Sequence, residues 1–296
     1  MEHIYVTPDD RLQKVFDTAP AGSVIHLAPG VYRQKTVIRT PGLTVIGSGA
    51  GKTRIVYNDY ARKRDTEGFA YITFRTYTLA VCAEGVTMRD LSIINDALQP
   101  EIKGQEVALS VYATDFRVEN CRLTSTQDTL FLGPLPPDLI ERYEGFLPDE
   151  LRLGGEMKQM FTDCLIEGTV DFIFGCGDCL FENCELRSLN DARNMGFVAA
   201  PAHSLSQKEG FRFRNCRFTC EAGVAPGSVY LARPWRDYGL ARFEYCTYED
   251  HIAVEGFDKW DGTERDRTAR FYETPEVSGR VLWVNRQEDT EEKVTI

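Results

Sequence analysis

The sequence has little positive charge for its length. It carries 34 Lys and Arg residues against 45 Asp and Glu residues, a formal net charge of −11. Nucleic-acid binding needs clustered Lys and Arg, and no segment supplies such a cluster, so nucleic acid is excluded as a partner. The same charge opposes a densely anionic polymer, although esterified or short substrates suffer less repulsion.

The sequence also lacks long apolar runs and an export signal. No apolar stretch reaches membrane-spanning length, so we expect no membrane partner. The first ten residues, MEHIYVTPDD, contain no basic region followed by an apolar stretch. Nine cysteines, an odd number, indicate reduced thiols rather than a disulfide framework. Together these features predict a cytoplasmic protein, or a secreted one if a leader has been removed.

Metal-ligand spacing is missing as well. Cys176-Gly-Asp-Cys179 is a lone Cys-x-x-Cys pair with no second pair. The four histidines are scattered along the chain: His3, His26, His203 and His251. We therefore predict no metal site.

One glycine-rich segment invites a phosphate-loop interpretation. Gly47-Ser-Gly-Ala-Gly-Lys-Thr53 is one residue short of the Gly-x4-Gly-Lys-Thr spacing. The next residues, 54–57, read as a strand, whereas a phosphate loop opens a helix. A nucleotide-binding function is therefore disfavoured.

A cysteine-containing repeat organises the chain. It is clear at 116–123, 179–186 and 211–218, looser at 160–166 and 242–248, and present at 86–93 with Leu91 replacing cysteine. Short alternating strands that return every few tens of residues, with no long amphipathic helix between them, favour a parallel β-helix over a leucine-rich horseshoe. The cysteines then form a ladder of small buried side chains.

The limits of this β-solenoid also follow from the sequence. Residues 24–27 and 43–46 read as initial coils, and the segment after about Trp260 as a C-terminal cap. No linker divides the chain, so we predict a single domain over residues 1–296. The Pro-rich, polar segment 133–156 is too long for a compact connection, and is either a flap beside a binding groove or a mobile loop.

Two aspartates occupy the same position of the repeat. Asp128 follows Cys121 by seven residues, and Asp171 follows Cys164 by seven. If residues 133–156 loop out, the two carboxylates stack on adjacent coils, roughly 5 Å apart by strand spacing. Such a pair holds one proton at a raised pKa, while a nearby cation keeps the other group charged. This is an acid and nucleophile pair.

The surroundings of Asp171 strengthen that interpretation. Asp171 lies in an apolar run, 170–174, where an unpaired charge is costly. Arg233 is the candidate partner, because a guanidinium can hold a carboxylate by two parallel hydrogen bonds. A purely structural ion pair is an equal alternative. The same count from Cys184 reaches Asp191, which leaves a turn-forming role open for these aspartates.

Five segments stand out in order over about residues 20 to 270: Pro29-Gly-Val-Tyr-Arg33, Gly104-Gln-Glu-Val-Ala-Leu109, Gln127-Asp-Thr129, Gly168-Thr-Val-Asp-Phe-Ile-Phe-Gly175 and Leu231-Ala-Arg-Pro-Trp235. They resemble the signature segments of pectin methylesterases. The resemblance implies a right-handed parallel β-helix, an aspartyl esterase without a cofactor, and methyl-esterified pectin or short oligogalacturonides as substrate. We also expect a monomer.

The resemblance also implies roles for individual residues. Asp171 attacks the C6 methyl-ester carbonyl of galacturonate, and Asp128 protonates the departing methanol and then activates water. Gln105 and Gln127 donate to the tetrahedral oxyanion. Arg233 holds the nucleophile. The expected substrate contacts are Trp235, Phe174, Phe131 and Val170.

Two other functions compete with this interpretation. Carboxylates about 5 Å apart also suit a retaining glycoside hydrolase acting on an acidic polysaccharide. The amides of Gln105 and Gln127 weigh against it, because they suit an oxyanion better than an oxocarbenium ion. The third alternative is a non-catalytic sugar-binding β-helix, which binds without turnover.

Overall fold

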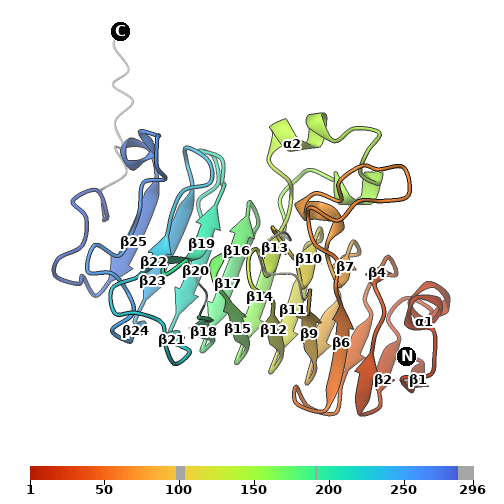
Figure 1. Cartoon of the computed structure of the whole chain (residues 1–296). Helices are drawn as coiled ribbons and strands as arrows, with labels where there is room; N and C mark the ends of the chain where they lie inside the picture. Colours follow the sequence, from red (N-terminus) through yellow and green to blue (C-terminus); the bar gives the residue numbers. More distant parts are fainter. Residues whose placement is uncertain (98–103, 191–192, 286–296) are drawn as a thin grey trace, which may run out of the picture.

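The computed structural model describes residues 1–97, 104–190 and 193–285, so Asp191 lies outside the described residues. The strands stack into successive coils of a parallel β-helix, from the N-terminal end to the C-terminal end of the chain (Figure 1). Every pairing between named strands is parallel. The predicted all-β solenoid is confirmed.

Three parallel sheets form the walls of the coil. Sheet A contains β1 (His3–Val6), β2 (Val24–Leu27), β5 (Thr44–Ile46), β8 (Thr87–Arg89), β11 (Phe116–Glu119), β14 (Lys158–Thr162), β17 (Asp178–Glu182), β20 (Phe211–Arg214), β23 (Leu240–Glu244) and β25 (Arg270–Thr274). Sheet B contains β3 (Gly30–Tyr32), β6 (Thr53–Tyr57), β9 (Ser92–Asn95), β12 (Arg122–Thr124), β15 (Leu165–Gly168), β18 (Glu185–Ser188), β21 (Arg217–Cys220) and β24 (Thr247–Tyr248). Sheet C contains β4 (Thr36–Ile38), β7 (Leu79–Val81), β10 (Leu109–Val111), β13 (Leu130–Leu132), β16 (Val170–Gly175), β19 (Gly196–Pro201) and β22 (Val229–Ala232).

The helices are short and lie outside this ladder of strands. They are α1 (Leu12–Thr18), α2 (Pro137–Arg142) and the 3-10 turns η1 (Thr73–Arg75), η2 (Asp149–Leu151) and η3 (Arg265–Arg267). None of the helices in the described part of the chain is long and apolar enough to cross a membrane.

The Asn-Cys pair of the repeat forms the corner between sheets A and B. Asn120, Asn183 and Asn215 have φ values of 49°, 55° and 53°, and Asp163 has 54°. Asn and Asp tolerate this left-handed conformation better than other residues with a side chain, because they can hydrogen-bond locally. Their side chains point to solvent, and the next residue turns inward as a cysteine. The repeat therefore encodes a bend.

The inward cysteines form the predicted ladder. Cys184 donates its thiol to the Phe161 carbonyl of the preceding coil at 3.4 Å, and Cys216 donates to the Phe181 carbonyl at the same distance. All nine cysteines are free. A small, weakly polar side chain suits this position, because it fills the inside of a tight corner and still satisfies a backbone carbonyl.

A column of aromatic rings fills the core behind sheet A. Phe161, Phe181, Phe213 and Phe243 stand in register on successive strands, with neighbouring ring centroids 5.3, 4.7 and 4.8 Å apart. Such pairs add about 0.5–1.5 kcal/mol each beyond the burial of their area. The column therefore fills the core of the central coils, which also carry strands of sheet C.

The two ends of the coil are closed differently. At the N-terminal end, α1 buries Leu12 and Phe16 in the core. At the C-terminal end, Trp283 packs against Phe257 and Phe271. The predicted cap therefore exists, but it begins later than Trp260, because β25 still belongs to sheet A.

Candidate active site

The register of sheet C stacks the two aspartates. Gln127 pairs with Val170, and Leu130 pairs with Ile173, so one offset places Asp128 beside Asp171. The backbone N–H of Asp128 donates to the Val170 carbonyl at 3.1 Å. The predicted stacking on adjacent coils is confirmed.

Both aspartates have the left-handed backbone of the Asn corners, but their side chains are buried. Their φ values are 64° for Asp128 and 48° for Asp171, and only 8% and 7% of their surfaces are exposed. Strained backbone of this kind persists where the surrounding structure over-determines it, and it clusters at functional sites.

Arg233 donates a hydrogen bond to each of the two carboxylate oxygens of Asp171. Its Nε donates to Oδ1 at 2.8 Å and its second terminal nitrogen, Nη2, donates to Oδ2 at 2.6 Å, which is the predicted bidentate contact. The guanidinium carbon lies 3.7 Å from the ring centre of Phe197 and 4.1 Å from that of Trp260. Packing between two aromatic rings fixes the planar guanidinium and thereby the carboxylate.

The two carboxyl groups have different electrostatic surroundings. Burial, and then the charge of Asp171, raise the pKa of Asp128 well above its usual range. Burial also raises the pKa of Asp171, but the hydrogen bonds and charge of Arg233 oppose that rise. Asp128 is therefore the group that keeps a proton. Asp171 is the group whose negative charge is stabilised by a neighbouring cation, Arg233.

The aspartates line a cavity of about 400 Å³ together with both predicted amides and two of the predicted aromatic residues. Gln105 and Gln127 lie on its wall beside the carboxylates. Phe174 and Trp235 lie on the same wall and meet edge to face, with ring centroids 5.7 Å apart. The cavity therefore combines an acid, a carboxylate, amide donors and aromatic faces.

Two predicted substrate contacts do not line this cavity. Phe131 has no exposed surface, and its ring is packed between Tyr112 and Phe174. The prediction that Phe131 touches sugar is wrong, because its ring is buried and packs against Phe174 from the neighbouring strand. Val170 is 7% exposed, and its contact with substrate stays a prediction.

Sequence reasoning missed Arg193. This arginine donates to the amide oxygen of Gln127 at 2.9 Å and to the hydroxyl of Thr169 at 2.7 Å. With its oxygen bound in this way, Gln127 has a fixed amide orientation and its NH₂ group faces away from Arg193. Arg193 belongs to no recurring motif, so only the three-dimensional structure reveals it.

Trp260 was also missed, because the sequence placed it at the start of the cap. It lines the cavity and covers Arg233. The Pro-rich segment contributes Leu139, Arg142 and Tyr143 to the same cavity, and its Asp138 pairs with Arg236 at 2.9 Å. The segment rises above sheet C in Figure 1, where the interpretation as a flap beside a groove places it.

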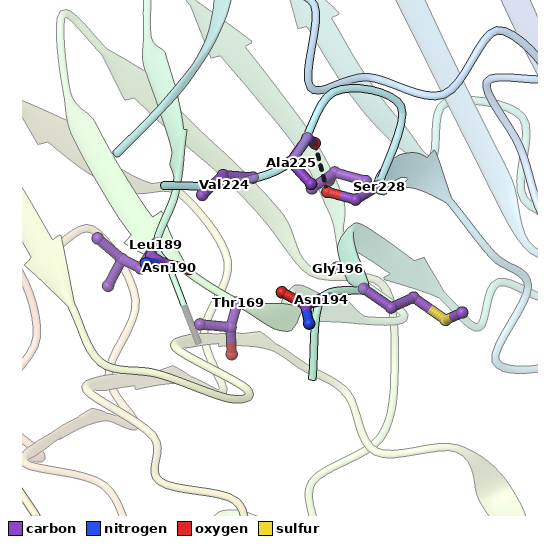
Figure 2. A pocket seen from close by; sticks show the side chains of 10 residues that line it. Thr169, Leu189, Asn190, Asn194, Gly196, Val224, Ala225 and Ser228 are labelled. Atoms are coloured by element: carbon purple, nitrogen blue, oxygen red, sulfur yellow. Dashed lines mark hydrogen bonds between the residues drawn. The ribbon is translucent and has the colours of Figure 1, made fainter. Parts of the chain in front are cut away.

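A second, smaller cavity lies where β19 and β22 begin. Its volume is about 20 Å³, and Thr169, Asn194, Gly196 and Val229 are among its lining residues. Figure 2 shows Thr169, Asn194 and Gly196 at this cavity, and the hydrogen bond from the Ser228 hydroxyl to the Ala225 carbonyl, at 2.7 Å. Such a volume holds about one water molecule, so this cavity is no substrate site.

Comparison with known proteins gives one consistent family. Pectinesterase 31 of Arabidopsis thaliana is 31% identical over 273 residues, which cover 88% of this chain and 77% of that protein. The structure of pectin methylesterase from carrot superposes with a TM-score of 0.80 at 23% identity, covering 97% of this chain and 89% of the carrot chain. A pectin methylesterase in complex with a hexasaccharide gives a TM-score of 0.77 at 25% identity, covering 92% and 86%.

The match of the family model is the most direct of these findings. The model described as "Pectinesterase" matches residues 3–133 and 153–293, so it leaves out only residues 134–152 between its two parts. The omitted residues fall within the Pro-rich flap, whereas the coils on either side are matched. The chain therefore belongs to the pectinesterase family.

Proposed function

We propose that this pectinesterase hydrolyses methyl esters of galacturonate units with Asp171 as nucleophile and Asp128 as general acid and base. Pectin methyl-ester hydrolysis is the reaction of the family to which the chain belongs. The observation that carries the residue roles is the bidentate hold of Arg233 on Asp171, with Asp128 stacked beside it in one cavity.

The first half of the reaction forms an acyl-enzyme. An oxygen of Asp171 attacks the C6 carbonyl carbon, because each of its oxygens keeps a free lone pair when Arg233 binds both. The negative charge that develops on the carbonyl oxygen accepts hydrogen bonds from the NH₂ groups of Gln105 and Gln127. The tetrahedral intermediate collapses, the C6–O bond breaks, and the leaving oxygen takes the proton of Asp128 to become methanol.

The second half restores the enzyme. Asp128, now a carboxylate, takes a proton from a water molecule that attacks the same C6 carbonyl. Asp171 leaves as a carboxylate and returns to its two hydrogen bonds with Arg233. The products are one galacturonate carboxylate with its released proton, and one methanol. The raised pKa of Asp128 suits this sequence, because the group must begin each cycle protonated.

The cavity supports a sugar substrate in spite of the acidic chain. Arg142, Arg233 and Arg236 line it, so the local surroundings are more positive than the net charge of −11 suggests. The faces of Trp235 and Phe174 suit the C–H faces of pyranose rings. We propose methyl-esterified pectin or oligogalacturonides as substrate, and a monomer with a single β-helix domain as the working unit.

One prediction about the setting of the enzyme needs correction. The prediction of a cytoplasmic protein is wrong, because pectinesterases act on pectin of the extracellular cell wall, and a secreted protein fits the family. The free cysteines misled that prediction. Five of them, Cys121, Cys164, Cys184, Cys216 and Cys246, lie at corners of the coil, which need small side chains, and this packing requirement does not depend on the redox compartment.

The test measures methanol and new reducing ends together, with methyl-esterified polygalacturonate as substrate. We expect methanol alone from the wild-type protein, and a loss of about 10⁴-fold or more in kcat for Asp171→Asn. Asp163→Asn is the matched control, because Asp163 has the same left-handed backbone in the same coil and an exposed side chain. Circular dichroism verifies that both variants are folded.

Each other outcome contradicts part of the proposal. New reducing ends would indicate a retaining glycoside hydrolase, since that enzyme breaks the chain rather than the ester. Substrate binding without either product would indicate a non-catalytic sugar-binding β-helix. Full methanol release by Asp171→Asn would exclude Asp171 as nucleophile and leave the esterase activity standing.

A further inference from the structure

Three side chains with metal-binding atoms meet at the outer edge of sheet B. Cys220 is the last residue of β21, while Glu249 and His251 follow β24 on the next coil. Their thiol, carboxylate and imidazole atoms all lie within 4.8 Å of one another. The sequence did not reveal this group, because one full coil separates Cys220 from the other two residues.

His251 is the unusual member of the group. It has no exposed surface, and neither of its ring nitrogens has a hydrogen-bond partner among the residues that the structure describes. Buried polar atoms are almost always paired, because leaving them unpaired costs free energy. An imidazole buried without a partner beside a thiol and a carboxylate therefore indicates a missing ligand.

The backbone around His251 is firmly held. The His251 carbonyl accepts a hydrogen bond from the N–H of Val229 at 3.0 Å, and Ile252 forms a bridge with Val229. This fixes the turn against the first residue of β22. The sheet thus fixes the backbone position from which the buried imidazole extends, and a supported backbone favours a pre-organised metal site.

Cys220 and Glu249 already approach each other. A Glu249 oxygen, Oε2, accepts from the backbone N–H of Cys220 at 3.0 Å and lies 3.6 Å from its sulfur. Cys220 is half-buried and Glu249 is exposed, so an ion can reach the group from solvent. Cys220 also lies at the end of a sheet B strand, away from the corner positions of the cysteine ladder.

We propose that Cys220, Glu249 and His251 bind a zinc ion. Sulfur, nitrogen and oxygen ligands together suit Zn²⁺, whereas Ca²⁺ and Mg²⁺ prefer oxygen ligands alone. The thiol loses its proton to solvent when the metal binds, the imidazole ligates through one neutral nitrogen, and water completes a tetrahedral set.

The bound ion joins two successive coils beside the smaller cavity of Figure 2, since Val229 both lines that cavity and binds the His251 carbonyl. It serves the fold rather than the esterase reaction, so this inference does not depend on the proposed function. Zinc binding should then stabilise the folded chain by an amount that grows with the logarithm of the free zinc concentration above Kd.

The test is zinc titration of the reduced full-length protein by isothermal calorimetry, with thermal unfolding in parallel. We expect one zinc ion per chain and a rise of about 4 °C in the unfolding midpoint at a free zinc concentration of about 100 times Kd. Cys220→Ser and His251→Ala should each weaken binding by about 100-fold or more. Cys82→Ser is the matched control, because it removes another half-buried thiol.

Cobalt binding gives a second measurement that does not depend on stability. Co²⁺ should produce a thiolate-to-metal absorption band in the wild-type and Cys82→Ser proteins and none in Cys220→Ser. If no zinc ion binds, or if Cys220→Ser and His251→Ala bind zinc as tightly as Cys82→Ser does, the proposed site is wrong.

Discussion

Asn and Asp residues with a left-handed backbone occur in two regions of the chain, exposed in one region and buried in the other. At the corners between sheets A and B, a left-handed Asn or Asp points to solvent, as at Asn183 and Asp163. On the path into sheet C, left-handed Asp128 and Asp171 are buried in a cavity. The left-handed turn alone therefore gives an aspartate no catalytic property. Burial, a stacked second carboxylate and a fixed cation turn the same residue type into an acid or a nucleophile.

After Asp171→Asn, the largest loss of activity should come from converting the other buried aspartate to asparagine, the residue found at the corners. Asp128→Asn keeps the left-handed backbone and the side-chain volume but cannot hold or return a proton. We expect kcat to fall by about 10³-fold, within the range for loss of a general acid and base. Steady-state methanol release measures it. A loss of less than about tenfold would contradict the acid-base role.

Arg233→Lys keeps the positive charge beside Asp171 but removes the planar guanidinium that binds both carboxylate oxygens. Lysine cannot make the two parallel hydrogen bonds, so we expect kcat to fall by about 100-fold. Arg233 opposes the raised pKa of Asp171, so a weaker hold lets that pKa rise further. Asp171 must be ionised to attack, so the acidic limb of the pH–rate profile should move to higher pH.

The profile is measured as kcat/KM against pH for the wild type and for Arg233→Lys. A profile with an unchanged acidic limb, at reduced rate, would mean that Arg233 acts only through geometry. If kcat/KM of Arg233→Lys equals that of the wild type at every pH, Arg233 has no role in catalysis.

Arg193→Gln should have a smaller effect, because Arg193 acts through Gln127. Without the hydrogen bond to its amide oxygen, Gln127 can rotate its amide, and we expect kcat to fall by about tenfold with little change in KM. Kinetics of the double variant Arg193→Gln, Gln127→Ala provide the control. If the two substitutions lower kcat independently, Arg193 does not act by orienting Gln127.

Asp163→Asn should have almost no effect on activity or stability, because Asp163 is one of the exposed corner residues. Asn already occupies the equivalent corners at Asn120, Asn183 and Asn215. We expect changes of less than about 0.5 kcal/mol in the free energy of unfolding, and no change in kcat. Urea unfolding and the methanol assay measure both. A large loss of activity would contradict the view that corner residues only form the bend.

Much of the fold could be predicted because the repeat is visible in one dimension. The Asn-Cys corners, the cysteine ladder and the stacking of Asp128 on Asp171 all follow from counting residues along the coil. The start of the cap was misplaced because β25 is a strand of sheet A, but Pro275 follows it where a cysteine-containing corner follows each of β11, β14, β17, β20 and β23.

The site residues that lie in segments resembling the family pattern could be predicted. Those that reach the cavity through contacts between coils could not. Asp171, Asp128, Arg233 and the two amides lie in recognised segments and reach one cavity. Arg193 and Trp260 reach it from segments without a motif. Phe131 lies on the same face of sheet C as Phe174 but does not reach the cavity, because the rings of Phe74, Tyr112 and Phe174 cover it. Residue spacing places a backbone on a coil, but only packing determines which side chains become exposed.

The identity of the nucleophile is the central claim, and mass spectrometry of the acyl-enzyme tests it most directly. The protein is mixed with a methyl-esterified oligogalacturonide, quenched in acid within the first turnover, digested and fragmented. We predict a mass increase equal to the substrate minus methanol on the peptide containing Asp171, and its absence in Asp171→Asn. An adduct on the peptide containing Asp128, or an equal adduct in Asp171→Asn, would contradict the account.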